Sequence, residues 1–507
     1  MNSRLKKDLS NRLDKIISLA KRRGFVFPSS EIYGGFSAVY DYGPYGVELK
    51  NNIKQEWWKR FVHHRDNIVG VDAALIMNPK VWEASGHLKN FSDSLVEDKS
   101  TNIRYREDYL NELTPENDEK FEKHYKQALE FMKKYMYGDY DDQIEWTVGK
   151  KSEEAWKRLQ NKGIKIFQNP DNNEIFVSEK AKSFNLMFKT FVGSTEETTN
   201  VAYFRPETAQ GIFVNFKNIL DSTRMKIPFG IAQIGKAFRN EITARQFIFR
   251  TREFEQMEIE YFIPEPKDNN DEEWKKYFEE WRVAMVAWMS DLGINVKEEI
   301  YELDVPENER AHYSKKTIDF EYKFPFGQRE IYGLAYRTNY DLTQHSKLSG
   351  EDLRYTDNDG NKFIPHVIEP SLGVDRTLLA VLCSAYNEEK LTSKNGKEEM
   401  RIVMKFPKWL APIKIAVFPL LKNKPELVKK AKEIFDDLKI KHMCEFDDNG
   451  NVGKRYRRQD EIGTPYCITV DFEGLDDNTV TVRDRDTMKQ ERIKIEELES
   501  YFQDKLN

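Results

Sequence analysis

Apolar residues recur at helical spacing in several long stretches of the chain. Between Leu5 and Ala20 they return every three or four residues, which predicts an amphipathic helix near the amino terminus. Residues 272–292 repeat this spacing with tryptophan, phenylalanine and methionine, a stripe that is typical of a helix packed on a core. We expect two further helices at residues 119–136 and 152–161.

Alternation of apolar and polar residues predicts strands elsewhere. Residues 238–262 contain two alternating stretches joined by a polar turn at residues 242–246, which predicts a β-hairpin. After Trp409 the pattern changes to a strand (IKIAVFPL), a helix at residues 425–438 and two more strands (YCITVDF and TVTVRDRD). This is an α/β arrangement of its own, so we place a domain boundary near Leu410.

A change of composition marks another segment between residues 99 and 200. Lys, Glu, Asp and Asn dominate there, and helical patches follow one another without strand alternation. We interpret this segment as a helical insertion. The expected domains are the first part of a core domain at 1–98, the insertion at 99–200, the rest of the core at 201–409 and a carboxyl-terminal domain at 410–507.

Composition excludes several classes of protein. A chain of 507 residues with 13% aromatic residues has enough apolar side chains to fold, although 33% of its residues are charged. No apolar run approaches the ~18 residues that a membrane span needs, so we expect no membrane partner. Because the net charge is -6, any contact with a nucleic acid must come from local basic patches.

The cysteines and the amino terminus bear on the compartment. Cys383, Cys444 and Cys467 lie far apart without metal-site spacing, which indicates buried thiols in a reducing compartment rather than disulfides or a cysteine zinc site. The amino terminus lacks the apolar core of a secretory signal, so we expect a cytoplasmic protein. A basic mitochondrial presequence is the alternative, and Asp8 and Asp14 count against it.

The predicted hairpin at 238–262 concentrates arginine. Guanidinium groups bind phosphate oxygens with two N–H groups and stay charged at physiological pH, so such a hairpin suits a nucleotide triphosphate. A surface hairpin held by salt bridges explains the same residues equally well. The charged residues around the turn are Arg239, Glu241, Arg245, Arg250 and Arg252.

The hairpin also resembles motif 2 of the class II aminoacyl-tRNA synthetases, in which Arg-x-Glu and a variable loop precede Arg-x-x-x-Phe. Arg239, Glu241, Arg250 and Phe254 occupy these four positions. This match favours the nucleotide over the salt-bridged hairpin.

Two more motifs follow in the order of that family. Residues 369–386 are similar to motif 3, a strand that enters a helix with Arg376 at the turn, and residues 42–62 resemble motif 1, the dimer-forming helix and strand. The segments RPETAQGIF, REFEQMEIEYF, GLAYRTNYDL and GKRYRRQDEIGTPYCITVDF are similar to homodimeric glycyl-tRNA synthetases. The resemblance implies an α+β catalytic domain with an antiparallel sheet, a carboxyl-terminal α/β anticodon-binding domain and a homodimer.

The resemblance also implies roles for individual residues toward ATP. Arg239 is expected to neutralise the charge that grows on the α-phosphate, which makes it the main catalytic candidate. Magnesium would bridge the phosphates, and Glu330 is its candidate ligand. The remaining roles are an acceptor for the adenine amino group, a ring stacked on adenine and two γ-phosphate ligands, assigned in turn to Glu241, Phe254, Arg250 and Arg376.

A glycine site must hold an ammonium and a carboxylate while it excludes larger side chains. The resemblance places Glu207, Glu258 and Glu369 around the ammonium, with Ser371 beside them. It assigns the substrate carboxylate to Arg337. Taken singly, each glutamate fits a solvated strand residue or a structural ion pair better, so only the set predicts the pocket.

A basic cluster lies in the carboxyl-terminal domain. Lys454, Arg455, Arg457 and Arg458 surround Tyr456, and basic residues mixed with aromatic ones suit single-stranded RNA. A solvated charged turn is the alternative. The resemblance to an anticodon-binding domain favours contact with tRNA.

The resemblance implies a two-step reaction. Glycine and ATP would form glycyl-adenylate, and glycine would then pass to the 3′ end of tRNA(Gly). ATP and Mg²⁺ are expected, whereas zinc is not, because residues 96–110 lack the cysteines that some relatives carry. Two alternatives are a synthetase-like protein that has lost catalysis, since fold does not fix function, and a synthetase for another small amino acid.

Overall fold

The computed structural model describes residues 3–107, 110–136, 152–169, 172–179, 181–193, 200–242, 246–267, 272–392, 396 and 398–506. The chain divides into two compact units. Unit 1 comprises residues 1–75, 207–237 and 246–507, and unit 2 comprises residues 76–206 and 238–245. The insertion expected at 99–200 lies inside unit 2, which extends beyond it at both ends.

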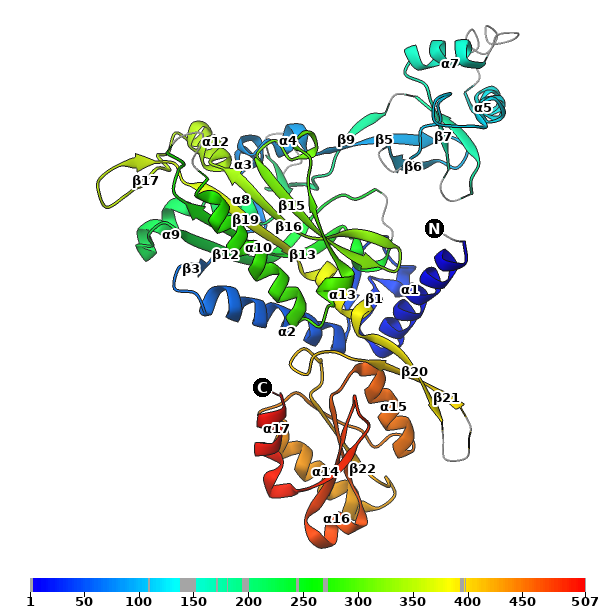
Figure 1. Cartoon of the computed structure of the whole chain (residues 1–507), viewed down its shortest axis with the longest axis vertical. Coiled ribbons are helices and arrows are strands. Elements are labelled where there is room, and N and C mark those ends of the chain that lie inside the picture. The colour runs from blue at the N-terminus through cyan, green and yellow to red at the C-terminus, as the bar shows by residue number, and fades with distance from the viewer. Residues whose placement is uncertain are drawn as a thin grey trace. The chain divides into compact units, whose positions relative to one another are not determined.

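A seven-stranded sheet forms the centre of unit 1 (Figure 1), with the strand order β14-β15-β16-β19-β13-β12-β3. β3 runs parallel to β12, and β14, β15, β16, β19 and β13 are antiparallel to one another in turn. The expected antiparallel sheet is confirmed. The strands are β3 (Ile68–Gly70), β12 (Phe229–Phe238), β13 (Glu253–Ile263), β14 (Ile300–Asp304), β15 (Lys316–Phe324), β16 (Gly327–Thr338) and β19 (His366–Gly373).

One face of this sheet packs against helices in the largest core of the molecule. Met257, Ile259 and Tyr261 alternate along β13 into this core, where they join Trp281 and Trp288 of the helix predicted from its aromatic stripe. Each buried side chain of this size contributes about 1.5–3 kcal/mol. The helices on this face are α1 (Ser3–Arg23), α2 (Pro44–Trp58), α10 (Trp274–Asp291) and α13 (Val374–Ala385).

The opposite face of the sheet holds a smaller core and the polar residues of interest. Phe262 of β13 and Val367 of β19 belong to this core together with Phe213 and Leu342. Because side chains alternate along a strand, Glu258 lies on this second face and is buried there. The covering helices are α8 (Ala209–Phe213), α9 (Phe216–Thr223) and α12 (Tyr340–Ser349).

The carboxyl-terminal part of unit 1 is an α/β domain with the strand order β23-β22-β24-β25-β26. β22 is parallel to β23 and β24, and the last two strands are antiparallel. The predicted helix and strands are confirmed. The elements are β22 (Ile415–Pro419), α14 (Pro425–Leu438), β23 (Cys444–Phe446), α15 (Val452–Ile462), β24 (Tyr466–Val470), α16 (Phe472–Asp477), β25 (Thr479–Asp484), β26 (Gln490–Lys494), η7 (Ile495–Glu497) and α17 (Leu498–Leu506).

Shorter elements complete unit 1. A two-stranded hairpin, β20-β21, follows α13 directly and leads to the carboxyl-terminal domain. The elements are β1 (Val26–Pro28), η1 (Glu31–Tyr33), β2 (Tyr40–Tyr42), η2 (Lys59–His63), η5 (Phe247–Phe249), α11 (Val296–Glu299), η6 (Glu307–Glu309), β17 (Tyr355–Thr356), β18 (Lys362–Phe363), β20 (Tyr386–Thr392) and β21 (Glu398–Met404).

Unit 2 mixes helices and strands, so the expectation of a helical insertion is wrong. The two helices expected in it are present as α5 and α7. The strands were missed because they are short: β7 and β8 have four residues each, and all four residues of β8 are buried, which leaves no alternation to detect. The elements are β4 (Ile76–Met77), α3 (Pro79–Ala84), α4 (His87–Asn90), β5 (Ser92–Asp98), β6 (Ile103–Arg106), α5 (Phe121–Tyr135), α7 (Ser152–Asn161), β7 (Lys165–Gln168), β8 (Ile175–Ser178), β9 (Lys182–Asn185), β10 (Lys189–Phe191) and β11 (Val201–Phe204).

Two expectations about the whole chain can be compared with the structure. Among the described helices, none combines the length and the apolar character that crossing a membrane requires. Cys383, Cys444 and Cys467 are all free thiols, and the first and last of them are buried.

Candidate active site

Five side chains that the sequence assigned to glycine meet in unit 1. Glu258 comes from β13, Glu369 and Ser371 from β19, Arg337 from β16, and Glu207 from the segment before α8. Their arrangement follows from register, because Glu258 pairs with Ser371 across the two strands and both side chains therefore share one face of the sheet.

A β-bulge brings Arg337 to the pocket. Tyr336 pairs with Ile368 and Thr338 with Val367, so β16 has one residue more than β19 between these pairs. That extra residue is Arg337. A bulge redirects the side chain of the inserted residue, and the positive φ of 58° at Thr338 marks the same irregularity.

Hydroxyl and amide groups hold two of the glutamates. Glu258 accepts hydrogen bonds from the hydroxyl of Thr208 and from Ser371 Oγ, which lies 2.8 Å away. Glu207 accepts from Gln210 Nε2 at 3.0 Å. These donors carry no charge, so the hydrogen bonds themselves orient the carboxylates without adding positive charge.

Arg337 is the cation at the centre of the pocket. Its Nε and Nη2 donate to the two carboxylate oxygens of Asp341 at 2.9 and 3.0 Å, and Nη1 donates to Glu369 Oε1 at 2.7 Å. The guanidinium carbon lies 3.8 Å from the centre of the Tyr313 ring. Arg337 is only 1% exposed. Its bonds to Asp341 and Glu369 use three of its five N–H groups.

The pocket has an excess of buried negative charge. Burial and then the charge of Glu207 raise the pKa of Glu258. Burial raises the pKa of Glu369 well above its ordinary value, and the charges of Glu258, Glu207 and Asp341 add to that effect against the opposing charge of Arg337. Ionised carboxylates that are crowded in this way are stabilised by a cation among them.

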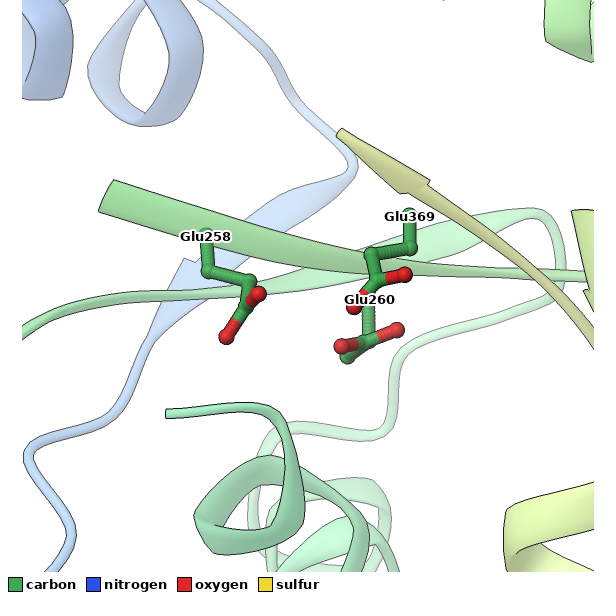
Figure 2. Close-up of side chains that lie close together, drawn as sticks. All are labelled: Glu258, Glu260 and Glu369. Carbon is green, nitrogen blue, oxygen red and sulfur yellow. The ribbon is translucent and has the colours of Figure 1, made fainter. Parts of the chain in front are cut away.

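A residue without a predicted role, Glu260, belongs to the same cluster. One carboxylate oxygen from each of Glu258, Glu260 and Glu369 lies within 4.8 Å of the others, and Figure 2 shows the three carboxyl groups close together beside β13 and β19. The sequence MEIEYF could have indicated that Glu260 lies beside Glu258, because residues two apart on a strand share a face. Asp341, Thr208 and Gln210 were also missed, since their hydrogen bonds depend on the packing of α8 and α12.

A second group of charges lies at the end of β16 that follows the turn from β15. Arg376, in the first turn of α13, lies 3.1 Å from a carboxylate oxygen of Glu330, and its guanidinium covers the ring of Phe249 at 4.6 Å. Burial, followed by the charges of Glu330 and Glu321, raises the pKa of Asp319 to about 7. The predicted γ-phosphate ligand and the predicted magnesium ligand are therefore neighbours.

A buried ionic network fixes the start of α13. Asp375 accepts from Lys50 Nζ at 2.9 Å, from the hydroxyl of Tyr42 and from the backbone N–H of Glu255 at 2.6 Å. Lys50 also lies 3.1 Å from the Glu255 carboxylate. The segments that resemble motifs 1, 2 and 3 thus meet at one carboxylate, that of Asp375, which directly precedes Arg376 in the chain.

The predicted adenine and phosphate ligands divide between the two units. Phe254 and Arg250 lie in unit 1, on β13 and at the end of η5, and both are half-buried. Arg239 and Glu241 lie in unit 2. There Arg239 Nε donates to the carbonyl of Pro206 at 3.1 Å, its guanidinium lies 5.3 Å from the ring centre of Phe91, and Glu241 is buried. Arg245 lies outside the described residues.

The basic cluster of the carboxyl-terminal domain lies on α15. Lys454 is exposed, Arg457 lies 3.1 Å from Glu399, and Arg458 pairs with Asp447. Arg455 differs from the others, because it is 1% exposed and donates to the backbone carbonyls of residues 419, 448 and 450. Its side chain therefore supports the loop before α15 rather than facing a ligand.

Two family models match parts of this chain. Residues 150–385 match the tRNA synthetase class II core domain (G, H, P, S and T). Residues 414–505 match the anticodon binding domain.

Similar proteins from three staphylococci span almost the whole chain. A glycine–tRNA ligase of Staphylococcus epidermidis is 50% identical over 496 residues, which cover 97% of this chain and 99% of that protein. Those of Staphylococcus haemolyticus and Staphylococcus aureus are each 49% identical, covering 97% and 98% of this chain and 99% of each relative. The chain therefore belongs to the glycine–tRNA ligase family of class II aminoacyl-tRNA synthetases.

Proposed function

We propose that the buried carboxylates of unit 1 bind the ammonium group of glycine. The observation that carries this proposal is the cluster of Glu207, Glu258 and Glu369. Arg337 donates a hydrogen bond to Glu369, and burial and mutual repulsion raise the pKa values of Glu258 and Glu369. An ammonium ion supplies the missing positive charge and three N–H donors.

Glycine is the amino acid that this pocket suits. Carboxylates that converge on the ammonium occupy the space that a side chain on the α-carbon would need, so alanine and serine are excluded by contact. The two N–H groups of Arg337 that neither Asp341 nor Glu369 uses are assigned to the substrate carboxylate.

As a member of its family, the chain activates glycine with ATP and transfers it to tRNA. The first step forms glycyl-adenylate and releases pyrophosphate. The glycine carboxylate is already ionised and attacks the α-phosphate, so no general base is needed, and catalysis consists of positioning and charge stabilisation. We assign the α-phosphate to Arg239, the γ-phosphate to Arg250 and Arg376, and the adenine to Glu241 and Phe254.

Glu330 has the chemistry that a magnesium ligand needs. Its carboxylate oxygens are of the kind that magnesium prefers, and its negative charge, after the effect of burial, helps to raise the pKa of the neighbouring Asp319. When bound, the ion would neutralise charge on the phosphates. We propose Glu330 as its principal protein ligand.

We propose that α15 contacts the tRNA. Lys454 is exposed on this helix, and Arg457 and Arg458 are only partly covered, so these three side chains are available to phosphates. Arg455 is omitted because of its burial.

We propose that the protein works as a homodimer in the cytoplasm. The turn that leads to the motif 1 helix exposes Ile32 at 88%, Tyr33 at 85% and Phe36 at 60%. Apolar side chains that are grouped and exposed in this way are typical of a protein interface. A second copy is the partner that the motif 1 resemblance implies, and the free thiols agree with a reducing compartment.

The experiment that tests the proposal replaces one pocket carboxylate. Glu258→Gln keeps the shape of the side chain but removes its charge, so the KM for glycine should rise at least about tenfold while the KM for ATP changes by less than about threefold. Glu253→Gln, on the same strand but paired with Lys236 at its exposed end, is the matched control and should change neither. Equal losses for glycine and ATP in Glu258→Gln would contradict the assignment.

A further inference from the structure

Glu260 is a fully buried carboxyl group in the wall of the glycine pocket. It is 0% exposed and lies two residues after Glu258, on the same face of β13. Within the described part of the chain, no N–H or O–H donor forms a hydrogen bond with either of its oxygens. A buried ionised carboxylate without a donor is costly, so this group needs an explanation.

Strand register gives Glu260 its partner. Glu258 pairs with Ser371 and Tyr261 pairs with Ile368, so both strands advance three residues between these pairs without a bulge. Glu260 therefore lies opposite Glu369. A carboxylate oxygen of each lies within 4.8 Å of the other (Figure 2), a separation at which two ionised groups in a buried site repel strongly.

The hydrogen bonds of the pocket distinguish Glu258 and Glu369 from Glu260. Glu369 accepts from Arg337 at 2.7 Å, and Glu258 accepts from Thr208 and Ser371. These donors stabilise the ionised forms of their partners.

Glu260 has the opposite surroundings. Burial raises its pKa well above the ordinary value, and the charges of Glu369, Glu258 and Asp341 raise it further, against the opposing charge of Arg337. The titratable and charged groups that face it come from β13, β19, β16 and α12, namely Glu258, Glu369, Arg337 and Asp341.

We propose that Glu260 is a neutral carboxylic acid in the working site and that its O–H group donates a hydrogen bond to Glu369, which holds that carboxylate toward Arg337 and the glycine ammonium. The inference rests on the proposed glycine site and deepens it. Glu260 is then a positioning residue, because it acts on the substrate through Glu369. Its neutral form also completes the wall of the pocket without adding another buried charge.

Paired substitutions distinguish a hydrogen-bond donor at position 260 from a negative charge there. Glu260→Met keeps most of the volume but has no donor, so the glycine KM in pyrophosphate exchange should rise at least about tenfold with little change in the ATP KM. Glu260→Gln supplies an N–H donor and no charge, so it should recover most of that loss. Glu258→Gln is the matched comparison, and it should not recover glycine binding, because Glu258 acts as a carboxylate.

Thermal melting without glycine provides a second readout. A carboxyl group whose pKa is raised by folding makes the folded state less stable as pH rises above the ordinary pKa, because the unfolded chain loses its proton first. Glu260→Gln removes this penalty, so its melting temperature relative to the wild type should increase as pH rises from about 5 to 8.

Each outcome decides between the possibilities. A loss of glycine binding in Glu260→Gln as large as that in Glu258→Gln would overturn the proposal, since it would show that Glu260 acts through its charge. Undiminished glycine binding in Glu260→Met would show that no positioning occurs. If the wild-type protein failed to use glycine at all, the proposed function would fail, while melting would still test the neutral acid. If Glu260→Met did not fold, Glu260→Gln would decide by both readouts.

Discussion

Arg401 and Asp460 form a buried two-pronged ion pair, in which Arg401 Nε and Nη2 each lie 2.8 Å from a carboxylate oxygen of Asp460. Arg401 belongs to the hairpin that follows α13, whereas Asp460 lies on α15 beside the basic residues. Asp460 also accepts from Arg483, and Arg401 reaches Glu389 at 2.7 Å. This network attaches the carboxyl-terminal domain to the β20-β21 hairpin, which directly follows α13.

Removing one partner of this pair should destabilise the protein. Arg401→Met leaves Asp460 buried with Arg483 and, at 4.0 Å, Arg457. Breaking a buried pair costs about 3–5 kcal/mol, so we expect a loss near the lower limit. Chemical denaturation followed by tryptophan fluorescence measures it. Lys15→Met is the control, because Lys15 pairs with Glu388 of the same hairpin at the surface and should change stability by less than about 1 kcal/mol. Equal effects of the two substitutions would contradict the importance of the buried pair.

His366 should make stability depend on pH. Its Nδ1 lies 2.6 Å from the hydroxyl of Tyr336, and burial, followed by the charge of Lys315, lowers the pKa of His366 to about 4. The unfolded chain therefore binds a proton before the folded chain does, and stability from this residue is lost as pH falls from about 6.5 to 4.

The effect of His366 on stability is limited because this residue binds only one proton. The slope cannot exceed about 1.4 kcal/mol per pH unit, and His366→Gln should remove it from denaturation midpoints measured between pH 4 and 7. His63→Gln, at an exposed position, serves as the control. A wild-type curve that runs parallel to that of His366→Gln would show that His366 does not stay neutral in the folded protein.

Arg239→Ala should abolish adenylate formation without unfolding the protein. The side chain is partly held by the Pro206 carbonyl and by Phe91, but its proposed role is to neutralise charge on the α-phosphate. Glycine-dependent pyrophosphate exchange should fall by much more than tenfold, and tenfold corresponds to about 1.4 kcal/mol of transition-state stabilisation. Arg239→Lys keeps the charge without the planar fork and should recover only part of the activity. Exchange that survived within tenfold in Arg239→Ala would rule out this role.

Glu330→Gln should change the magnesium requirement. Loss of a carboxylate ligand is expected to raise the magnesium concentration for half-maximal exchange about tenfold, while the glycine KM stays within about threefold. Glu302→Gln, on β14 beside Arg282, is a control that removes a carboxylate elsewhere on the sheet. A magnesium dependence identical to that of the wild type would exclude Glu330 as the principal ligand.

The sequence predicted those parts of the structure that local pattern determines. The aromatic stripe of α10 and the apolar spacing of α14 fixed both helices to within about two residues. The short, buried strands β7 and β8 lacked alternation and were missed. Prediction therefore failed where an element was too short for its period to show.

The candidate site followed the same division. Glu258 and Glu369 could be proposed from motifs, but Asp341 and Gln210 join the pocket only through the packing of α12 and α8. The sequence shows Glu260 as the second acid on one face of a strand. Only the structure shows that its carboxyl oxygens accept no hydrogen bond from the described residues. The sequence likewise could not show that Arg455, unlike its basic neighbours on α15, is buried.

The selection of glycine by the carboxylate pocket is tested most directly by amino-acid-dependent exchange of pyrophosphate into ATP, without tRNA, for glycine, alanine and serine. We expect rapid exchange with glycine and at least about a hundredfold lower kcat/KM with the other two, because steric exclusion discriminates more strongly than a missing contact. Comparable exchange with alanine, or none with any amino acid from protein shown to be folded, would contradict the proposed pocket.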